Sequence, residues 1–396
     1  MDEIIRGNSK LKMLFSKLLM HFPNMKKDIN QIDWLVIMPQ DRLHGSEQFL
    51  MNLVTHVSKK GNQCVVMFLK KKISGDWEHL EESCIIKYGA SKNVFIGYLS
   101  LLPRLIVVSR KYKIKRSFTS QTLINAMMGL MKNFKFFKNT IVIVRESNSI
   151  FHLLKGLKLK RYIIAYWIGY GSVDLVICQT KFMKDQLVQA MPWMEKKLRI
   201  KVIPNPIDLD VIKEKEREQL PIELKGKRFI VAAGRLVPAK GFDVLIKSFD
   251  VLQKEDPQLE LIILGEGSER QKLEKIVEGL KLQNKVHLIG FVNNVYPYFK
   301  EAAACVLSSR IEGFPNVLLQ MMSQNTKVVS TLSAGGIDEL DGVFTCEIES
   351  IEGLKVALRR CLEANTDQFR VLFDENLKIR TVKFFIDSVL TNIEEY

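Results

Sequence analysis

Residues 227–255 read KRFIVAAGRLVPAKGFDVLIKSFDVLQKE, and residues 259–269 follow as LELIILGEGSE. The first stretch opens on a short apolar run, passes a loop with glycine and proline, and continues with apolar residues at helical spacing. The second stretch returns to an apolar run and ends in another glycine loop. Strand, loop, helix and strand in this order are typical of a parallel sheet with crossover helices.

The same alternation extends over most of the chain, in two series. Short apolar runs bounded by polar loops are predicted strands, and the longer amphipathic stretches between them are predicted helices. The predicted strands of the first series are 33–38, 63–69, 140–146 and 173–180, with a helix at 49–61. Those of the second lie within 227–236 and at 259–264, 285–292, 303–310 and 326–331, with a terminal helix at 375–395.

A turn-rich segment, RIKVIPNPIDL at 199–209, separates the two series. A chain of 396 residues is long enough for two domains with separate cores. We therefore predict an α/β fold with Rossmann-like domains over 1–205 and 206–375, and a terminal helix over 376–396 with the option of packing back on the first domain. Ligands of such sheets bind at the carboxyl ends of the strands, so the loops there are the candidate site.

Bulk composition favours a soluble globular protein, with 47% hydrophobic and 26% charged residues. The six cysteines are scattered without a CxxC pair, which favours reduced thiols over disulfides or a zinc site. No secretory signal is recognised, and Lys10–Pro23 is too short and too charged for a membrane span. We expect the protein on the cytoplasmic side of the membrane.

Positive charge is concentrated in the first half. Residues 1–205 hold 34 Lys and Arg against 14 Asp and Glu, whereas the remainder holds 25 against 30. No carboxylate occurs from Ser83 through Arg145. Basic residues interleaved with aromatic ones favour an anionic membrane surface, with 110–116 and 155–161 as contact segments. A purely solvated basic face is the alternative, and no nucleic-acid motif accompanies the charge.

Two loops of the second half carry the strongest chemical signals. In AAGRLVPAKGFD (232–243), Arg235 and Lys240 lie beside a glycine and a helix start, a pattern that binds anions. In SSRIEGFPNVLLQ (308–320), Glu312 precedes an apolar helix whose first amides can face a ligand oxygen. Taken singly, Arg235 and Lys240 have an alternative interpretation as ordinary solvated side chains. For Glu312, the alternative is that it only caps the helix.

Read in order, GRLVPAKGFDVLI, LGEGSERQKLE, VHLIGFVNNV, VLSSRIEGFPNVLLQMM and STLSAGG resemble the retaining glycosyltransferases of the GT-B fold, in family 4 of group 1. The resemblance is strong over 199–340 and looser in the first half, through LHGSEQFLMNLV and TIVIVRESN. It implies two Rossmann-like domains that face each other across a cleft. It also implies transfer of a sugar from a nucleotide diphosphate sugar, with retention of anomeric configuration.

The resemblance also implies roles for individual residues. Arg235 and Lys240 correspond to the pair that neutralises the departing diphosphate, and Glu312 to the carboxylate that contacts the donor sugar. Gln320 stands where the family usually has a glutamate on the ribose, which puts nucleotide affinity in question. The implied donor-binding residues are Gly45, Ser46, Gly234, Arg235, Lys240, Gly265, Glu312, Gly313, Phe314, Pro315, Asn316, Val317 and Gln320, and the acceptor-side residues are His44, Asn125 and Arg145.

The predicted function is transfer of a hexose or N-acetylhexosamine, from a UDP-sugar by preference, to a lipid-diphosphate-linked saccharide of O-antigen or capsular polysaccharide. Asp208 and Asp210 form the one DxD sequence, and it lies in the turn-rich segment, so we expect no metal cofactor. The predicted location is the inner face of the cytoplasmic membrane. Two alternatives remain: a sugar-nucleotide epimerase of the same fold, and a non-catalytic membrane-binding protein with a degenerate donor site.

Overall fold

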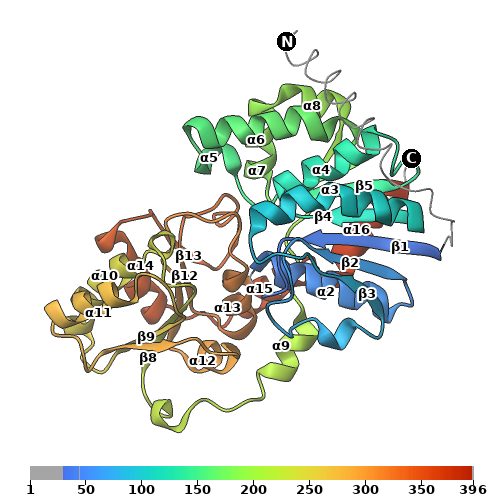
Figure 1. Cartoon of the computed structure of the whole chain (residues 1–396). Coiled ribbons are helices and arrows are strands. Elements are labelled where there is room, and N and C mark those ends of the chain that lie inside the picture. Colours follow the sequence, from blue (N-terminus) through green and yellow to red (C-terminus); the bar gives the residue numbers. More distant parts are fainter. Residues whose placement is uncertain (1–29, 44, 395–396) are drawn as a thin grey trace. The chain divides into compact units, whose positions relative to one another are not determined.

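The computed structural model describes residues 30–43 and 45–394, which form two compact units. Unit 1 contains the described residues up to Gln179, then Met183–Ile203 and the segment that begins at Ile386. Unit 2 contains Thr180–Phe182 and Pro204–Phe385. Each unit is built on one all-parallel sheet (Figure 1), which confirms the predicted α/β class.

The sheet of unit 1 has seven strands in the order β3-β2-β1-β4-β5-β6-β7, and every neighbouring pair is parallel. Crossover helices connect most of the strands, as parallel pairing requires. The elements are β1 (Asn30–Met38), α2 (Gly45–Lys59), β2 (Cys64–Phe68), β3 (Cys84–Lys87), α3 (Val94–Lys111), β4 (Tyr112–Thr119), α4 (Thr122–Asn133), β5 (Ile141–Arg145), α5 (Ile150–Leu153), α6 (Gly156–Gly169), β6 (Leu175–Cys178), α7 (Lys181–Ala190), α8 (Pro192–Lys197) and β7 (Arg199–Val202).

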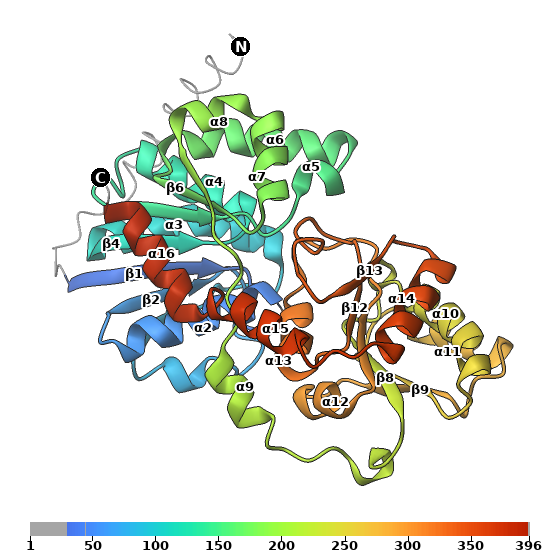
Figure 2. The same ribbon diagram turned by 180° about the vertical axis from the view of Figure 1, so that it is seen from behind.

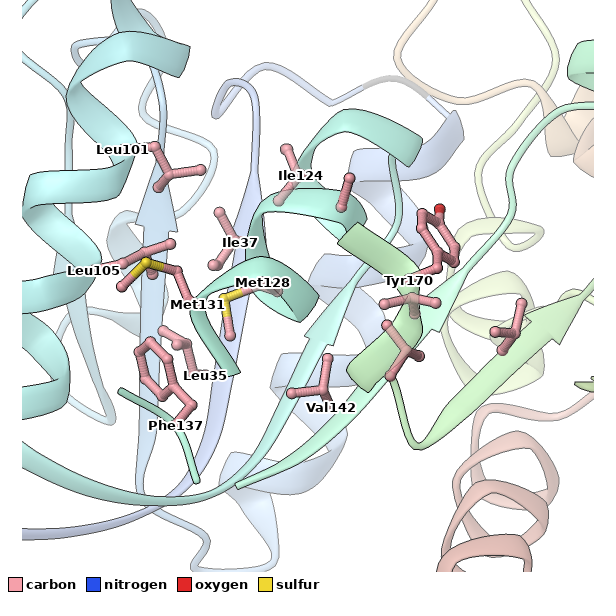
Figure 3. Packing of buried hydrophobic residues seen from close by; sticks show 14 of the residues in the cluster. Leu35, Ile37, Leu101, Leu105, Ile124, Met128, Met131, Phe137, Val142 and Tyr170 are labelled. Carbon is pink, nitrogen blue, oxygen red and sulfur yellow. The ribbon is translucent and has the colours of Figure 1, made fainter. Parts of the chain in front are cut away.

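Alternate residues of the strands supply the core of unit 1. Leu35 and Ile37 of β1 point to the same face of the sheet, where Leu101 of α3 and Met128 of α4 pack against them (Figure 3). All four side chains are completely buried. This packing fixes α3 and α4 over one face of the sheet, with the carboxyl ends of the strands left to the loops.

The sheet of unit 2 has six strands in the order β10-β9-β8-β11-β12-β13, again all parallel. The elements of unit 2 are α9 (Leu209–Lys215), β8 (Phe229–Ala233), α10 (Phe242–Glu255), β9 (Glu260–Leu264), α11 (Arg270–Gly279), β10 (Val286–Gly290), α12 (Tyr296–Glu301), β11 (Ala304–Leu307), α13 (Asn316–Gln324), β12 (Val328–Thr331), β13 (Phe344–Cys346), α14 (Ile351–Glu363) and α15 (Phe369–Lys378). The last helix, α16 (Val382–Glu394), begins in unit 2 and continues into unit 1.

Both faces of the unit 2 sheet are covered by helices. Val231 of β8 joins the cluster that contains Leu318 and Met322 of α13, whereas Ile230, its neighbour, joins the cluster that contains Leu245 of α10. Burial on both faces explains why the strands are continuous apolar runs rather than alternating ones. The sequence pattern around 227–264 therefore predicted this unit well.

The strand order reverses once in each sheet, between β1 and β4 in unit 1 and between β8 and β11 in unit 2. In open parallel sheets, the loops at the carboxyl ends of two such strands diverge and leave room for a ligand. The loop after β8 carries Arg235 and Lys240, and the loop after β11 carries Glu312. The two loops singled out in the sequence thus meet at the switch point of unit 2.

The C-terminal stretch is two helices, not the single terminal helix predicted over 376–396. α15 ends at Lys378 and α16 begins at Val382, because the Arg380 carbonyl accepts a hydrogen bond from the amide of Ile207 and Thr381 Oγ1 accepts one from the amide of Phe384. From Ile386 onward α16 belongs to unit 1 (Figure 2).

Sequence reading missed three strands of unit 1, namely β3, β4 and β7. The basic segment 110–116, predicted as a membrane contact, contains the end of α3 and the first half of β4. Tyr112 and Ile114 are buried there, while Lys113 and Lys115 are exposed. Only the exposed side chains of this segment can meet a membrane, and the contact itself stays a prediction.

Candidate active site

An ion pair lies at the switch point of unit 2. Lys240 Nζ is 2.5 Å from Glu312 Oε1, and the two side chains are 18% and 16% exposed. Ser309 Oγ donates a second hydrogen bond to the same carboxylate oxygen, at 2.7 Å. The carboxyl ends of β8 and β11 therefore present an ammonium and a carboxylate that contact each other and stay within reach of solvent.

Two glycines let the loops around this pair approach one another. A Cβ atom on Gly265 would lie 1.9 Å from the carbonyl oxygen of Gly234, and one on Gly241 would lie 2.1 Å from that of Ser308. Gly241 also has a φ of +62°, in the left-handed region that glycine adopts without strain. Lys240 extends along Gly234, whose added Cβ would be 3.3 Å from Lys240 Cε. Larger residues at these glycines would displace the ammonium.

A second ion pair holds the two loops together. Arg310 Nη1 and Nη2 donate to Asp243 Oδ1 and Oδ2, each at 2.9 Å, in a bidentate contact. These hydrogen bonds lower the pKa of Asp243 and raise that of Arg310. Arg310 Nη1 also donates to the carbonyl oxygen of Pro238, at 2.6 Å. The loop after β11 is thereby fixed to the loop after β8 and to the first turn of α10.

Arg235 shares the loop of Lys240. Its side chain is exposed, and its guanidinium has no hydrogen bond or ion pair with any other described residue. The backbone beside it is held by Leu236, whose amide donates to the carbonyl oxygen of Glu266 and whose carbonyl oxygen accepts from the amide of Glu269, both at 2.9 Å. Arg235 is thus a solvent-accessible cation on a fixed backbone.

Helix α13 begins at Asn316, one residue after Pro315, and no side chain caps its N-terminus. Glu312 therefore does not cap this helix, and the alternative left open by the sequence is wrong. The side chain faces Lys240 instead because that ammonium compensates the charge of a largely buried carboxylate. The open end of α13 leaves first-turn amides as potential partners for a ligand oxygen.

Phe314 is buried and packs against Arg380, a residue that sequence reasoning missed. The guanidinium of Arg380 lies 5.0 Å from the centroid of the Phe314 ring. Burial lowers the pKa of Arg380 to about 10, and neither its Nε nor its Nη1 has a hydrogen-bond partner among the described residues. Next to Phe314, Asn316 Oδ1 accepts a hydrogen bond from Asn205 Nδ2 at 2.8 Å. No local pattern marks Arg380, since it lies far along the chain from the loops that it contacts.

Gln320 faces α12 rather than Glu312. Its Nε2 donates to the hydroxyl of Tyr296 at 3.2 Å, and burial raises the pKa of this tyrosine to about 12. Gln320 is partly exposed, as are Gly313 and Val317 of the same segment. The amide of Gln320 thus has one partner within the protein and a face that remains accessible.

Unit 1 has a buried polar cluster at the carboxyl end of β5, centred on Glu146. Its Oε1 accepts from the hydroxyl of Tyr170 at 2.5 Å and from Asn125 Nδ2 at 3.3 Å. Its Oε2 accepts from the hydroxyl of Tyr166 at 2.7 Å and from Thr122 Oγ1 at 3.1 Å. Burial raises the pKa of Glu146, and the hydrogen bonds oppose that rise. Sequence reasoning missed this carboxylate.

Of the predicted acceptor-side residues, Asn125 and Arg145 both belong to this cluster. The amide of Asn125 is buried and also donates to the carbonyl oxygen of Arg145 at 3.1 Å. Arg145 Nη1 donates to Ser120 Oγ at 2.7 Å, its guanidinium lies 4.4 Å from the centroid of the Phe49 ring, and burial lowers its pKa to about 9. Both side chains are thus engaged within unit 1.

The remaining predicted residues of unit 1 lie at the start of α2. Gly45 is the exposed first residue of the helix. His44 and the side chain of Ser46 lie outside the described part of the structure. Their predicted roles toward donor and acceptor stay predictions.

Asp208, the first member of the DxD sequence, caps α9 by accepting a hydrogen bond from the amide of Val211 at 3.1 Å. Within 30–43 and 45–394, no three His, Cys, Asp or Glu side chains come together as a potential metal site. Over the same residues, no helix combines the length and the apolar character needed to cross a membrane.

Comparison with known proteins gives a family and a fold. Residues 212–377 match the family described as Glycosyl transferases group 1. An uncharacterized glycosyltransferase of Methanocaldococcus jannaschii is 29% identical over 263 residues, which cover 63% of this chain and 64% of that protein. The N-acetylgalactosamine-N,N'-diacetylbacillosaminyl-diphospho-undecaprenol 4-alpha-N-acetylgalactosaminyltransferase of Campylobacter jejuni is 33% identical over 219 residues, 54% of this chain and 57% of that enzyme.

The chain thus spans less than two thirds of the length of these relatives. Among solved structures, Anabaena HepE in complex with UDP and glucose superposes with a TM-score of 0.75 at 16% identity, over 92% of this chain and all of HepE. At that identity the likeness shows the fold, which is the predicted GT-B fold. Residues 212–377 thus form a domain that matches the glycosyl transferases group 1 family.

Proposed function

We propose that this protein is a retaining glycosyltransferase that moves a hexose or N-acetylhexosamine from a nucleotide diphosphate sugar, with UDP as the favoured nucleotide. The contact between Lys240 and Glu312 carries the proposal, because it sets a cation and a carboxylate together at the switch point of unit 2. The family match over 212–377 supports the same chemistry. UDP in the HepE complex supports the choice of nucleotide.

The donor would separate Lys240 from Glu312 and bind both side chains. A diphosphate oxygen takes the place of Glu312 at the ammonium of Lys240, and a sugar hydroxyl takes the place of Lys240 at the carboxylate. Arg235, which has no partner among the described residues, adds a second positive charge to the diphosphate. First-turn amides of α13 add backbone donors for the phosphate and sugar oxygens. Gln320 would contact the ribose.

In the reaction, the bond between the anomeric carbon and the diphosphate oxygen breaks while the acceptor hydroxyl attacks from the same side. The departing phosphate oxygen takes the proton of that hydroxyl, so no protein nucleophile is needed. Negative charge develops on the diphosphate, where Lys240 and Arg235 stabilise it without a metal ion. Glu312 holds the sugar in place through its hydroxyls and is not consumed.

The proposed acceptor is a lipid-diphosphate-linked saccharide, and the proposed pathway is assembly of O-antigen or capsular polysaccharide. The diphospho-undecaprenol acceptor named for the Campylobacter jejuni relative supports this class of substrate. The excess of 34 Lys and Arg over 14 Asp and Glu in residues 1–205 supports work at an anionic surface. We therefore propose a peripheral location on the inner face of the cytoplasmic membrane.

A thermal-shift screen across UDP-, GDP- and other nucleotide sugars tests the donor, because a ligand at about 100 times its Kd stabilises the fold by roughly 2.7 kcal/mol. The stabilising donor is then incubated with a lipid-diphosphate-linked saccharide, and product and its anomeric configuration are read by NMR. Transfer with retention is expected. An epimerised nucleotide sugar without transfer would indicate the epimerase instead, and donor binding without any turnover would indicate a non-catalytic protein.

A further inference from the structure

Helix α3 carries a stripe of exposed apolar side chains. Phe95, Leu99 and Val107 are 66%, 63% and 38% exposed, and Pro103 lies between them at the same four-residue spacing. Residues four apart fall on one side of a helix, so the stripe runs along the length of α3. The opposite side of α3 packs into the core of unit 1 (Figure 3). Large apolar groups that face solvent in a row mark an interaction surface.

A groove of about 430 Å³ opens beside the C-terminal half of this helix. Pro103 and Val107 line it, so the groove continues the apolar stripe. Three cations also line it, Lys87, Arg104 and Lys111. An apolar surface that ends among cations suits an amphiphile with an anionic head.

Among the described residues, the cations of the groove have no acidic partner. The ammonium groups of Lys87 and Lys111 lie 6.0 Å and 5.5 Å from the centroid of the Tyr112 ring, and neither forms an ion pair with a described residue. Arg104 donates instead to the carbonyl oxygens of Phe68, at 2.8 Å, and Lys87, at 3.2 Å. No Asp or Glu occurs between residues 83 and 145. The positive charge is therefore available to an external anion.

We infer that the α3 stripe and the adjoining groove form the surface by which unit 1 docks on a bilayer of anionic phospholipid. Phe95, Leu99 and Val107 enter the boundary between head groups and acyl chains, while lipid phosphates contact Lys87 and Lys111. Charge complementarity decides the occupant, since a groove lined by three cations and no carboxylate attracts anionic head groups. This inference deepens the proposed membrane partner, but vesicle binding requires neither donor nor acceptor.

The test is flotation of the full chain with vesicles of phosphatidylcholine alone or with phosphatidylglycerol added. The wild type is expected to float with the anionic vesicles only. Phe95→Ser combined with Leu99→Ser should lower partitioning by about tenfold or more per side chain. Lys87→Glu and Lys111→Glu should each lower it at least about fivefold, and added salt should do the same.

Matched controls use exposed residues elsewhere. Ile222→Ser and Val371→Ser, at side chains 77% and 60% exposed in unit 2, should float like the wild type. Lys59→Glu and Lys60→Glu, at the C-terminal end of α2, should do the same. Each variant is checked for an unchanged melting temperature and an unchanged donor-induced thermal shift. That shift reports the proposed donor site, so its loss is distinguished from a loss of docking.

Four outcomes would overturn the inference. The first is a wild type that does not float, and the second is a Phe95→Ser, Leu99→Ser variant that floats unchanged. The third is loss of flotation caused by Phe15→Ser or by Leu157→Ser on α6 while the α3 variant keeps it. The fourth is concentration-dependent self-association of the wild type, measured by sedimentation, that the α3 variant abolishes without effect on flotation. That last result would assign the stripe to a second copy of the chain.

Discussion

The two sheets reverse their strand order in the same way, yet the carboxylates near the carboxyl ends of their strands, Glu312 after β11 at the switch point of unit 2 and Glu146 after β5 in unit 1, are surrounded differently. In unit 2, Lys240 and Glu312 are partly exposed, and Glu312 has one further hydrogen bond, from Ser309. In unit 1, Glu146 is 2% exposed and accepts four hydrogen bonds within the unit. A partly exposed pair can exchange partners with a ligand, whereas a satisfied buried carboxylate resists exchange. Identical topology therefore does not imply identical use of the two sites.

The substitutions with the greatest predicted consequence remove the ion pair of unit 2. Glu312→Ala and Lys240→Ala should each lower kcat/KM for transfer by about 10²–10³, because each removes a charge that acts on the donor. Far-UV circular dichroism and the melting temperature should change little. Glu278→Ala and Lys247→Ala, at exposed positions of α11 and α10, are the controls. Full turnover by Glu312→Ala would remove the basis of the proposed mechanism.

The second prediction concerns the contribution of Glu146 to the stability of unit 1. Glu146→Ala should lower the free energy of unfolding by about 3 kcal/mol or more, since it leaves buried donors of Tyr166, Tyr170 and Thr122 without their acceptor. Urea unfolding followed by fluorescence measures the change. A stability within about 0.5 kcal/mol of the wild type, as for ordinary surface substitutions, would show that the cluster does not hold unit 1 together.

A third effect concerns the clamp behind the ion pair of unit 2. Asp243→Asn weakens the bidentate contact with Arg310 and lets the loop of Lys240 shift. We expect about a tenfold loss in kcat/KM, because small misplacements of binding groups are costly. The free energy of unfolding should fall by only about 1–2 kcal/mol. Unchanged kinetics would limit Arg310 to a structural role.

The fourth effect is a pH dependence of stability that arises from Glu146 in unit 1. Burial raises the pKa of Glu146 above its ordinary value of 4.5, so the folded state retains a proton that the unfolded state releases. Stability contributed by this group is complete below pH 4.5 and is lost as pH rises toward the raised pKa. Melting temperatures of Glu146→Gln should therefore decline less over this interval than those of the wild type. If the melting temperatures of the wild type and of Glu146→Gln changed in parallel with pH, a raised pKa of the Glu146 carboxyl would be contradicted.

The last prediction, with the least expected change, concerns the proposed contact between Gln320 and the ribose of the donor. Gln320→Glu should strengthen donor binding by about three- to tenfold, because a carboxylate accepts hydroxyl hydrogen bonds more strongly than an amide does. The hydroxyl of Tyr296 can turn to donate to the new carboxylate. Isothermal calorimetry with the best donor measures the Kd. Weaker binding by this variant would mean that the amide nitrogen of Gln320 donates to the ligand.

The sequence was most informative where function and fold depend on local pattern. Continuous apolar runs predicted β8 and β9, and the glycine loops between strand and helix marked Arg235, Lys240 and Glu312. Neither the spacing nor the residue types could tell that Glu312 faces Lys240 across 72 positions. That contact depends on strand order, which arises only when β11 pairs with β8.

Unit 1 was harder to predict because the residues that form its key contacts are distant along the chain. The donors to Glu146 lie on α4, on α6 and directly after α6, at least 20 residues away along the chain. β4 did carry a usable signal, since Tyr112 and Ile114 alternate with Lys113 and Lys115. The density of charge in that segment favoured a surface interpretation over a strand.

Helix α16 is divided between the units, with its residues up to Phe385 in unit 2 and those from Ile386 in unit 1. During translation, the seven strands of unit 1 leave the ribosome first, but the helical segment that completes this unit emerges only after all of unit 2. Arg199 of β7 meets the carbonyl oxygen of Asn392 at that stage. Nascent unit 1 therefore lacks its helical segment from Ile386 until unit 2 has been synthesised. In a chain stalled before Ile386, the incomplete unit 1 would be exposed to chaperones and proteases.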